Sequence, residues 1–512
     1  MLWAGTVLCA ALAAGGLLVP QRRARYVLLA AALVLAPILV VGDNWDSARI
    51  ADIRDRPALA ALAVAVALAA VYLAALLVRA RPALLVPALV ATLPFRVPVD
   101  LGAGSANLLL PLYAVIAVGV VAGLLKQGQT PLRNGGPLRY VRLVLGAVIV
   151  LYALQSALAD DISPAVQDVG FFLVPFAALF VLLAEQPLDG AALRRVLWVL
   201  AAEGVAFALV AGYQYAAQDL FWNDKVIAGN EAHQYFRVNS LFFDPNILGR
   251  YLVVTMVALA AVVAYGRRRA ELIGASAVFV LLLVTLLVTF SQSSTIALIV
   301  AMLVLAAARW GFAQGVAAGV ATVVLLAASI ALISGGGLAD EDSSGRKGLI
   351  DGGVEMAKDA PVLGVGSGAF AAEFRDRFGA AEGFAAESHT TPITIIAEQG
   401  IVGLVAYLAL LAATIGGLVL ALGPRLAKPA RGSPLAAGLT AIYAVLLVHS
   451  LGYAAFLTDP ATWAVLAFAA GTLAPARARE RLRPASGLAE QPLQAAPRAE
   501  LEGGAPQPRP TG

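Results

Sequence analysis

Apolar runs long enough to cross a lipid bilayer follow one another along most of this chain of 512 residues. A helix needs about 20 mainly apolar residues to span the hydrocarbon core. With that length as a guide, the runs lie at 2–20, 26–41, 58–78, 83–95, 108–125, 140–158, 169–184, 194–213, 247–265, 271–290, 295–309, 314–333, 391–422, 435–457 and 461–474. Sixty per cent of the residues are apolar, only 13% are charged, and the mean hydropathy is +0.84, values typical of polytopic membrane proteins. The sequence therefore predicts an all-α fold, a transmembrane bundle of about 12–15 helices.

The charges of the loops indicate on which side of the membrane each loop lies. Short loops with an excess of Lys and Arg stay in the cytoplasm, and here basic loops alternate with acidic or neutral ones. This alternation places the two longest polar loops, 214–246 and 334–391, together on the extracytoplasmic side. Arg22, Arg23 and Arg25 follow the first run instead of preceding it, so we expect a retained span with the N-terminus outside. ATP and nucleotide sugars are poor substrate candidates for loops on that side.

The runs and loops divide the chain into six segments. In order, these are N-terminal spans (1–213), an extracytoplasmic loop (214–246), further spans (247–333), a large extracytoplasmic loop (334–391), C-terminal spans (392–474) and a tail (475–512). The tail is rich in proline and has no periodicity, which predicts a disordered cytoplasmic extension. The single cysteine, Cys9, lies inside the first run, so neither a disulfide framework nor a cysteine metal site is expected.

The large loop has the pattern of two short helices. Residues Leu349, Ile350, Gly353, Val354 and Ala357 fall at helical spacing and the pattern stops at Pro361, while Phe370, Phe374 and Phe378 form a second stripe. These patterns predict two amphipathic helices on the membrane face.

Three glycines separate the two predicted helices, at Gly364, Gly366 and Gly368. The spacing has a superficial likeness to a dinucleotide-binding loop, but no strand precedes it and the loop is expected outside. A tight turn explains these glycines better.

Two arginines and a histidine stand where loops meet spans. Arg346 comes just before the first amphipathic helix, His389 just before the span at 391–422, and Arg237 precedes an apolar turn in the other loop. Arginine binds phosphate oxygens bidentately and stays charged, and histidine exchanges a proton near neutrality. Together they suit a reaction in which a hydroxyl attacks an activated carbon while a pyrophosphate leaves.

Simpler structural explanations exist for several of these residues. Asp244 and Asn246 flank a proline in the form of a helix start, so they could simply cap the ninth span. A single loop histidine is commonly a satisfied polar group; besides His389 the chain has His233 and His449. His449 sits near the outer end of a span, where an ionisable group is a functional hypothesis by default. The sequence contains no HExxH, P-loop or cluster of His with acidic residues, so no protein-held metal is expected.

The stretch from Gly345 to Gly403 resembles the bacterial O-antigen ligase / O-antigen polymerase family, membrane glycosyltransferases that act on lipid-linked glycans. It has an arginine opening a helix, then APVLGVGSGAF, then a histidine leading into the span ITIIAEQGIVGLVAY. Arg237, in FRVNSLFFDPNILGRYL, looks like the family's other arginine, and SQSST at 291–295 occupies the place of its S-R-G/S turn. The sequence departs from the family at Thr390, where Asn is usual, and at Gln292, where Arg is usual.

This resemblance implies a fold, a reaction and partners. The fold would be of the GT-C type, in the bacterial cytoplasmic (inner) membrane with the active site on the extracytoplasmic side. The donor would be an undecaprenyl-pyrophosphate-linked glycan and the acceptor a lipid-linked or lipid-anchored saccharide. The transfer would be inverting, without metal, nucleotide or other cofactor, and membrane lipids would be the remaining partners, with no nucleic acid.

The resemblance also implies roles for individual residues. His389 would be catalytic, because it would orient or deprotonate the acceptor hydroxyl, and Arg237 and Arg346 would bind the donor pyrophosphate. Asp244, Asn246 and Glu398 would support these groups, although Asp244 and Glu398 could equally be local caps.

Two alternatives remain from other functional classes. A transporter or flippase of lipid-linked saccharides should carry its polar groups at mid-bilayer, on broken helices and near internal repeats. Here the polar groups lie at one face and no repeat is evident. A purely structural membrane subunit would leave the arginines and the patterned loop unexplained. Within the enzyme hypothesis, polymerase and ligase differ only in the acceptor, which the sequence does not distinguish.

Overall fold

A computed structural model describes most of the chain. The described residues are 1–47, 50–100, 105–126, 139–186, 188–232, 235–311, 313–314, 317, 320, 343–379, 388–422, 433–472 and 511–512. For 52–53, 97–100, 105–107, 225, 232 and 343–346 only the backbone is described. The span expected at 314–333, the disordered tail expected at 475–512 and His233 lie wholly or almost wholly outside these residues. Met1–Ala474 is one compact unit, and Pro475–Gly512 is a second one.

Helices account for nearly all of the described structure. In chain order they are α1 (Leu2–Leu18), α2 (Arg22–Asp43), α3 (Ala51–Asp55), α4 (Pro57–Ala80), η2 (Pro82–Leu84), α5 (Leu85–Thr92), α6 (Leu110–Leu125), α7 (Arg139–Gln155), η3 (Ser156–Leu158), α8 (Ser163–Asp168), η4 (Val169–Leu173), α9 (Val174–Ala184), α10 (Gly190–Ala217), α11 (Asp224–Ala232), α12 (Pro245–Tyr265), α13 (Arg269–Thr289), α14 (Gln292–Trp310), α16 (Ser343–Asp359), α17 (Phe370–Phe378), α18 (Thr391–Leu422), α19 (Pro434–Ser450) and α20 (Pro460–Thr472). Two short strands, β1 (Val97–Asp100) and β2 (Ser105–Leu108), pair antiparallel with Val97 opposite Leu108.

The lengths and composition of these helices confirm the expectation of an all-α, polytopic membrane protein. In the part of the chain that the structure describes, nine helices are long and apolar enough to cross a membrane, and further apolar helices are shorter. Helix α4 shows the effect of a lipid environment most clearly, since its most apolar window is only 6% buried although it consists almost entirely of Leu, Val and Ala. Such a helix is stable only where lipid covers its sides. The β hairpin is a small addition that the sequence did not predict.

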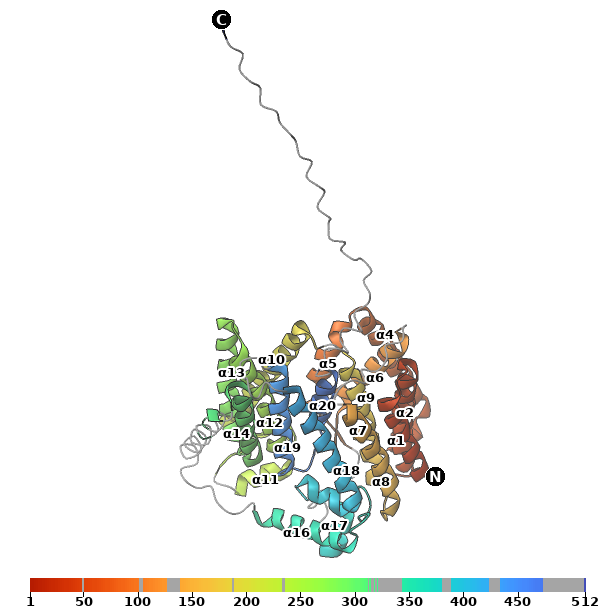
Figure 1. The fold of residues 1–512 in the computed structure, drawn as a ribbon. Coiled ribbons are helices and arrows are strands. Elements are labelled where there is room, and N and C mark those ends of the chain that lie inside the picture. Colours follow the sequence, from red (N-terminus) through yellow and green to blue (C-terminus); the bar gives the residue numbers. More distant parts are fainter. Residues whose placement is uncertain are drawn as a thin grey trace. The chain divides into compact units, whose positions relative to one another are not determined.

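Helix α19 lies between two groups of buried apolar side chains. One group comes mainly from α1, α2, α5 to α7, α9, α18 and α20, and the other from α10 and α12 to α14. Leu439 and Tyr443 of α19 belong to the first group, whereas Ala437 and Ala441 belong to the second. Because residues four apart share one face of a helix, α19 packs against different neighbours on two faces, as its central position in Figure 1 shows.

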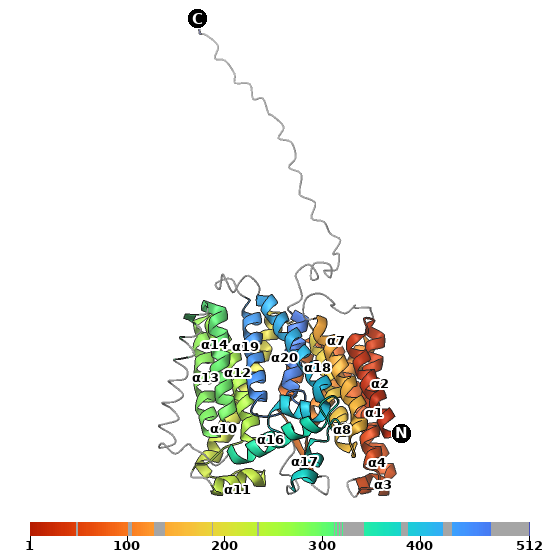
Figure 2. The same ribbon diagram turned by 60° about the horizontal axis from the view of Figure 1, so that its bottom comes forward.

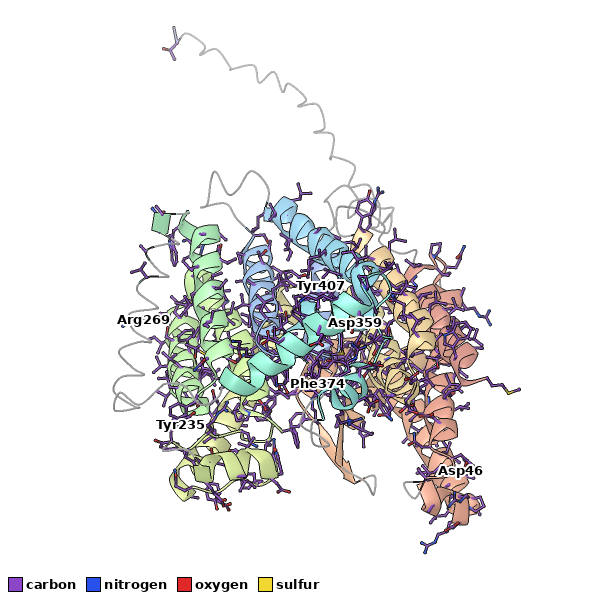
Figure 3. The ribbon with its side chains drawn as sticks, turned by 90° about the horizontal axis from the view of Figure 1, so that it is seen from below. Asp46, Tyr235, Arg269, Asp359, Phe374 and Tyr407 are labelled. Carbon is purple, nitrogen blue, oxygen red and sulfur yellow. The ribbon has the colours of Figure 1, made fainter. Side chains whose placement is uncertain are left out.

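Both polar loops contribute helices to the same end of the bundle. Figures 1 and 2 show α11, from the loop at 214–246, at the same end as α16 and α17, from the loop at 334–391. We call this end the loop end. Figure 3 looks at it directly and shows α16 crossing the bundle, with Phe374 of α17 beside it. Leu349 and Met356 of α16 pack with Phe374 and with Ala397 of α18, so the two amphipathic helices expected from the sequence are present.

The connection between α16 and α17 inserts into a break in α18. We call this connection, 361–368, the inserted turn. Gly400 has φ 61° and ψ −160° and interrupts α18, which leaves backbone groups in need of other partners. The N–H of Val365 donates to the carbonyl of Ala397 (3.0 Å), and the N–H of Ile401 donates to the carbonyl of the first residue of the turn (2.9 Å). Irregular backbone within a membrane helix is stable where protein surrounds it.

Glycines make this insertion possible. A Cβ on Gly364 would lie 2.2 Å from the carbonyl carbon of Glu398, and one on Gly400 would lie 2.4 Å from the carbonyl carbon of Val362. Both glycines have positive φ, which other residues rarely adopt. The tight turn expected at these glycines is therefore one that packs directly on another helix backbone.

Candidate functional site

His389 lies just before α18 on an unusual backbone. Its φ is 62°, a value uncommon for residues other than glycine. Neighbouring side chains hold it there: the N–H of Thr390 donates to Oγ of Ser388 (3.2 Å), and Oγ1 of Thr390 donates to the carbonyl of Leu451 (3.1 Å). The imidazole is half-buried, and its centroid lies 6.5 Å from that of Tyr453. Backbone strain of this kind is found mainly at functional sites.

A second histidine, His449, ties the end of α19 to the beginning of α12. Its side chain is fully buried, and Nε2 donates to the carbonyl oxygen of Asn246 at 3.1 Å. Oδ1 of Asn246 in turn accepts from Oγ of Ser291 (2.8 Å), and Oδ1 of Asp244 accepts from the N–H of Asn246 (2.6 Å). Asp244 is thus the N-cap of α12, and Asn246 joins α12 to α14 and α19.

The sequence analysis did not select Arg250 and Asp459, which form a buried ion pair. Nε of Arg250, inside α12, lies 3.1 Å from Oδ2 of Asp459, and the two side chains are 6% and 7% exposed. Oδ1 of Asp459 accepts from the N–H of Ala461, at the beginning of α20 (3.0 Å). A single signal could have identified Arg250, namely an ionisable residue within an otherwise apolar span.

Tyr453 brings these groups together. Its ring centroid lies 6.5 Å from that of His389, 5.8 Å from that of His449 and 5.9 Å from the guanidinium carbon of Arg250. We call His389, His449, Arg250, Asp459 and Tyr453 the Tyr453 cluster. It gathers residues from α12, α19 and the segments before α18 and α20, which lie far apart in the sequence.

Arg96 adds a second positive group near Asp459. It is half-buried and lies between α5 and β1. Burial lowers the pKa of Arg96, and the charge of Arg250 lowers it further, whereas the charge of Asp459 opposes the shift. Arginine remains protonated at any working pH, so Arg96 and Arg250 are two cations beside one carboxylate.

Arg237 lies elsewhere at the loop end. Its backbone N–H and carbonyl pair with the side-chain amide of Asn230 (2.9 and 3.0 Å), and its Nε donates to the carbonyl of Thr289, at the end of α13 (3.1 Å). A cation is favourable near the C-terminal end of a helix. In the described contacts, Arg237 is therefore held by α11 and α13 and not by the Tyr453 cluster.

Arg346 lies in the first turns of α16, and its side chain is outside the described residues.

Glu398, on α18, is buried, and its Oε1 accepts from the N–H of Phe370 at the beginning of α17 (3.1 Å). Glu398 thus holds the inserted turn and α17 against α18.

Within the described ranges, no three His, Cys, Asp or Glu residues are placed so that they could hold a metal ion. Metal independence remains a prediction from the resemblance.

A comparison with protein families finds a match over residues 277–408, which is described as O-antigen ligase. The matched part runs from α13 to the first half of α18, and it contains Arg346, His389 and Glu398 together with the inserted turn. The match supports the O-antigen ligase/polymerase family for this segment of the chain. A comparison with curated proteins gives no match.

The match to the O-antigen ligase family supports a general class of reaction. That class is the ligation or polymerisation of surface polysaccharide, a glycosyltransferase-like reaction on lipid-linked saccharides. The apolar helices agree with a multi-pass membrane protein. Arg237, Asp244 and Asn246 lie outside the matched residues, so the match itself does not assign them a role.

Proposed function

We propose that this protein transfers a glycan from an undecaprenyl-pyrophosphate donor to the hydroxyl of an acceptor sugar, at the extracytoplasmic side of the bacterial cytoplasmic membrane. The observation that carries the proposal is the position of His389: it lies within the family match, on a strained backbone, in the polar loop that contributes α16 and α17 to the loop end. A GT-C-like arrangement agrees with a helical bundle whose polar groups meet at one end.

The proposed reaction forms one bond and breaks one bond at the anomeric carbon of the donor. The acceptor oxygen attacks this carbon from the side opposite to the pyrophosphate, which inverts its configuration. The bond between the carbon and the pyrophosphate oxygen breaks, and undecaprenyl pyrophosphate leaves with the electron pair. The proton of the acceptor hydroxyl passes to a base. Such a substitution needs a positioned base and a stabilised leaving group, and we propose that it needs no metal.

In this proposal His389 orients the acceptor hydroxyl and accepts its proton, a contribution of about 10²–10⁴-fold in rate for general acid–base catalysis. Arg237 and Arg346 bind the pyrophosphate, whose negative charge grows as it leaves. Asp244 and Asn246 act on the beginning of α12, and Glu398 acts on the inserted turn, so we propose that these three position the site and do not touch the reacting atoms.

Cells that make the surface glycan test the proposal. Wild-type protein is compared with His389→Ala, Arg237→Ala and Arg346→Ala, with Asp376→Asn as a control on the exposed surface of α17, and the membrane level of each protein is measured. We expect the first three variants to lose most glycan transfer at a normal protein level. Accumulation of single lipid-linked repeats indicates a polymerase, and accumulation of long unattached lipid-linked chains indicates a ligase. Normal transfer in all three variants contradicts the proposed site.

The break in α18 is the observation that favours the transporter alternative. Transporters commonly place broken helices at their substrate sites, and α18 is interrupted at Gly400. Here the chain's own inserted turn fills the break and pairs with its backbone groups. A flippase would move a lipid-linked saccharide across vesicle membranes without lengthening or transferring it, and this result in a reconstituted assay would favour the alternative.

A further inference from the structure

A small cavity lies beside Arg96, Arg250 and Asp459. It has a volume of about 60 Å³ and lies between α5, α10, α12 and the beginning of α20. A cavity needs roughly 10–15 Å³, measured in this way, to hold one water molecule. The space is therefore large enough for a group of several heavy atoms, such as a phosphoryl group.

The charged wall of the cavity carries more positive than negative charge. Arg96, Arg250 and Asp459 are the charged residues among those that line it, so two positive charges face one negative charge. The carboxylate is already occupied, because one oxygen pairs with Arg250 and the other caps α20. Among the residues that the structure describes, none forms a hydrogen bond or an ion pair with Arg96. Arg96 is the cation that an anion in the cavity would neutralise.

Among the described residues, no further carboxylate lines the cavity. Glu203, on α10, approaches it only through Tyr251, whose hydroxyl donates to Oε2 of Glu203 at 2.6 Å. The other lining residues are apolar apart from Tyr251, and they include Leu200 and Val254. Val254 follows Arg250 by one helical turn along α12, which is about 6 Å further from the loop end, and Ile247 precedes Arg250 on the same helix. Apolar side chains therefore flank the charged group of the cavity.

This arrangement fits an anion that is attached to an apolar chain. A phosphoryl group between the two guanidiniums would replace the missing negative charge, and arginine binds phosphate oxygens through paired N–H groups. The apolar chain would continue past the apolar wall into the surrounding lipid. The guanidinium carbon of Arg250 lies 5.9 Å from the ring centroid of Tyr453, whose neighbours include His389, so an anion bound here would lie near the proposed base.

We propose that this cavity binds a phosphoryl group of the polyprenyl-diphosphate lipid, with Arg96 making the direct contact and Asp459 holding Arg250 in place. The inference rests on the proposed function for the identity of the lipid. It adds Arg96 and Arg250 to the two arginines already proposed, and it assigns the diphosphate to a site that the described contacts link to His389 through Tyr453.

Binding to the purified full-length protein tests this site without glycan transfer. The protein is placed in nanodiscs of phosphatidylcholine, and Kd is measured for undecaprenyl diphosphate, for inorganic diphosphate and for phosphatidylglycerol. Arg96→Gln removes the charge without breaking an ion pair, and Arg96→Lys keeps a charge but not the paired donors. Arg309→Gln is the matched control, because Arg309 is a half-buried arginine whose Nε donates to the carbonyl of Ala264, at the other end of α12.

We expect Arg96→Gln to weaken binding of undecaprenyl diphosphate about tenfold or more, because a hydrogen bond to a charged group is lost. Arg96→Lys should lie between this variant and the wild type, and Arg309→Gln should bind normally. Wild-type affinity in Arg96→Gln overturns the inference. Equal affinity for inorganic diphosphate or phosphatidylglycerol overturns the assignment to the polyprenyl lipid.

Failure of the cavity assignment can be distinguished from failure of the proposed function. If Arg96→Gln binds normally while His389→Ala abolishes transfer in cells, the cavity assignment fails and the proposed reaction stands. If Arg96→Gln loses binding while His389→Ala transfers glycan at the normal rate, the cavity assignment stands and the proposed catalytic site fails.

Discussion

Arg250 of α12 and Asp459, just before α20, form a buried ion pair with 3.1 Å between Nε and Oδ2. The two residues are 209 positions apart in the chain, and they join the two groups of helices near the proposed site. A buried pair of this kind contributes little net stability, but removal of one partner leaves an uncompensated charge. The ion pair therefore couples the folded position of the beginning of α12 to that of the beginning of α20.

We expect Arg250→Gln to destabilise the folded protein by about 3–5 kcal/mol, the usual cost of an unpaired buried charge. The double variant Arg250→Gln/Asp459→Asn should recover most of that loss, because neither member of the ion pair is left without its partner and Asn still caps a helix. Thermal unfolding in detergent measures both. A double variant no more stable than Arg250→Gln would show that the pair is not coupled in this way.

Because the inserted turn packs on α18, we expect alanine substitutions at two glycines of the same loop to differ in their effect on the level of folded protein. Gly364→Ala should sharply lower the membrane level of folded protein, because its Cβ would lie 2.2 Å from the backbone of α18 at a positive φ. Gly348→Ala, in α16, has no neighbour within 4 Å of the new Cβ and should be neutral or stabilise its helix by about 0.5–1 kcal/mol. Equal protein levels for the two variants would mean that the turn does not pack on α18.

Glu398 should tolerate an amide better than a truncation. Glu398→Gln keeps an oxygen that can accept from the N–H of Phe370, whereas Glu398→Ala leaves this buried donor unpaired at a cost of about 1–3 kcal/mol. We therefore expect Glu398→Gln to retain transfer and Glu398→Ala to lose protein or activity. Activity and protein level are measured together. Complete loss of activity in well-folded Glu398→Gln would show instead that its carboxylate takes part in the reaction.

The side of the membrane at which the loop end lies can be measured by labelling. Cys9 is the only cysteine and is buried, so a new cysteine has little background. Asp376→Cys, on the exposed surface of α17, should react with an impermeant maleimide on intact cells. Arg268→Cys, exposed between α12 and α13 at the other end, should react only after permeabilisation. The reverse pattern would place the proposed site in the cytoplasm.

How well the sequence predicted the structure differs from one element to the next. The expected runs at 26–41 and 271–290 correspond to α2 and α13 within a few residues, because a helix that must satisfy its backbone in lipid is marked by its own composition. The stripe of Phe370, Phe374 and Phe378 likewise predicted α17, since its period is a local property. The role of Arg250 was missed because its partner Asp459 belongs to a distant segment, and periodicity carries no information on that pairing.

The sequence by itself determined that this protein is a multi-pass helical membrane protein with two amphipathic helices in a polar loop and a segment similar to O-antigen ligases. These properties follow from local hydropathy, helical periodicity and short motifs. Only the tertiary structure decided that the inserted turn fills the break at Gly400, that Tyr453 lies near both His389 and Arg250, and that Arg96 shares a cavity with Arg250 and Asp459. The physical reason is that each of these contacts depends on which helices become neighbours, and side-chain packing between segments far apart in the chain decides this.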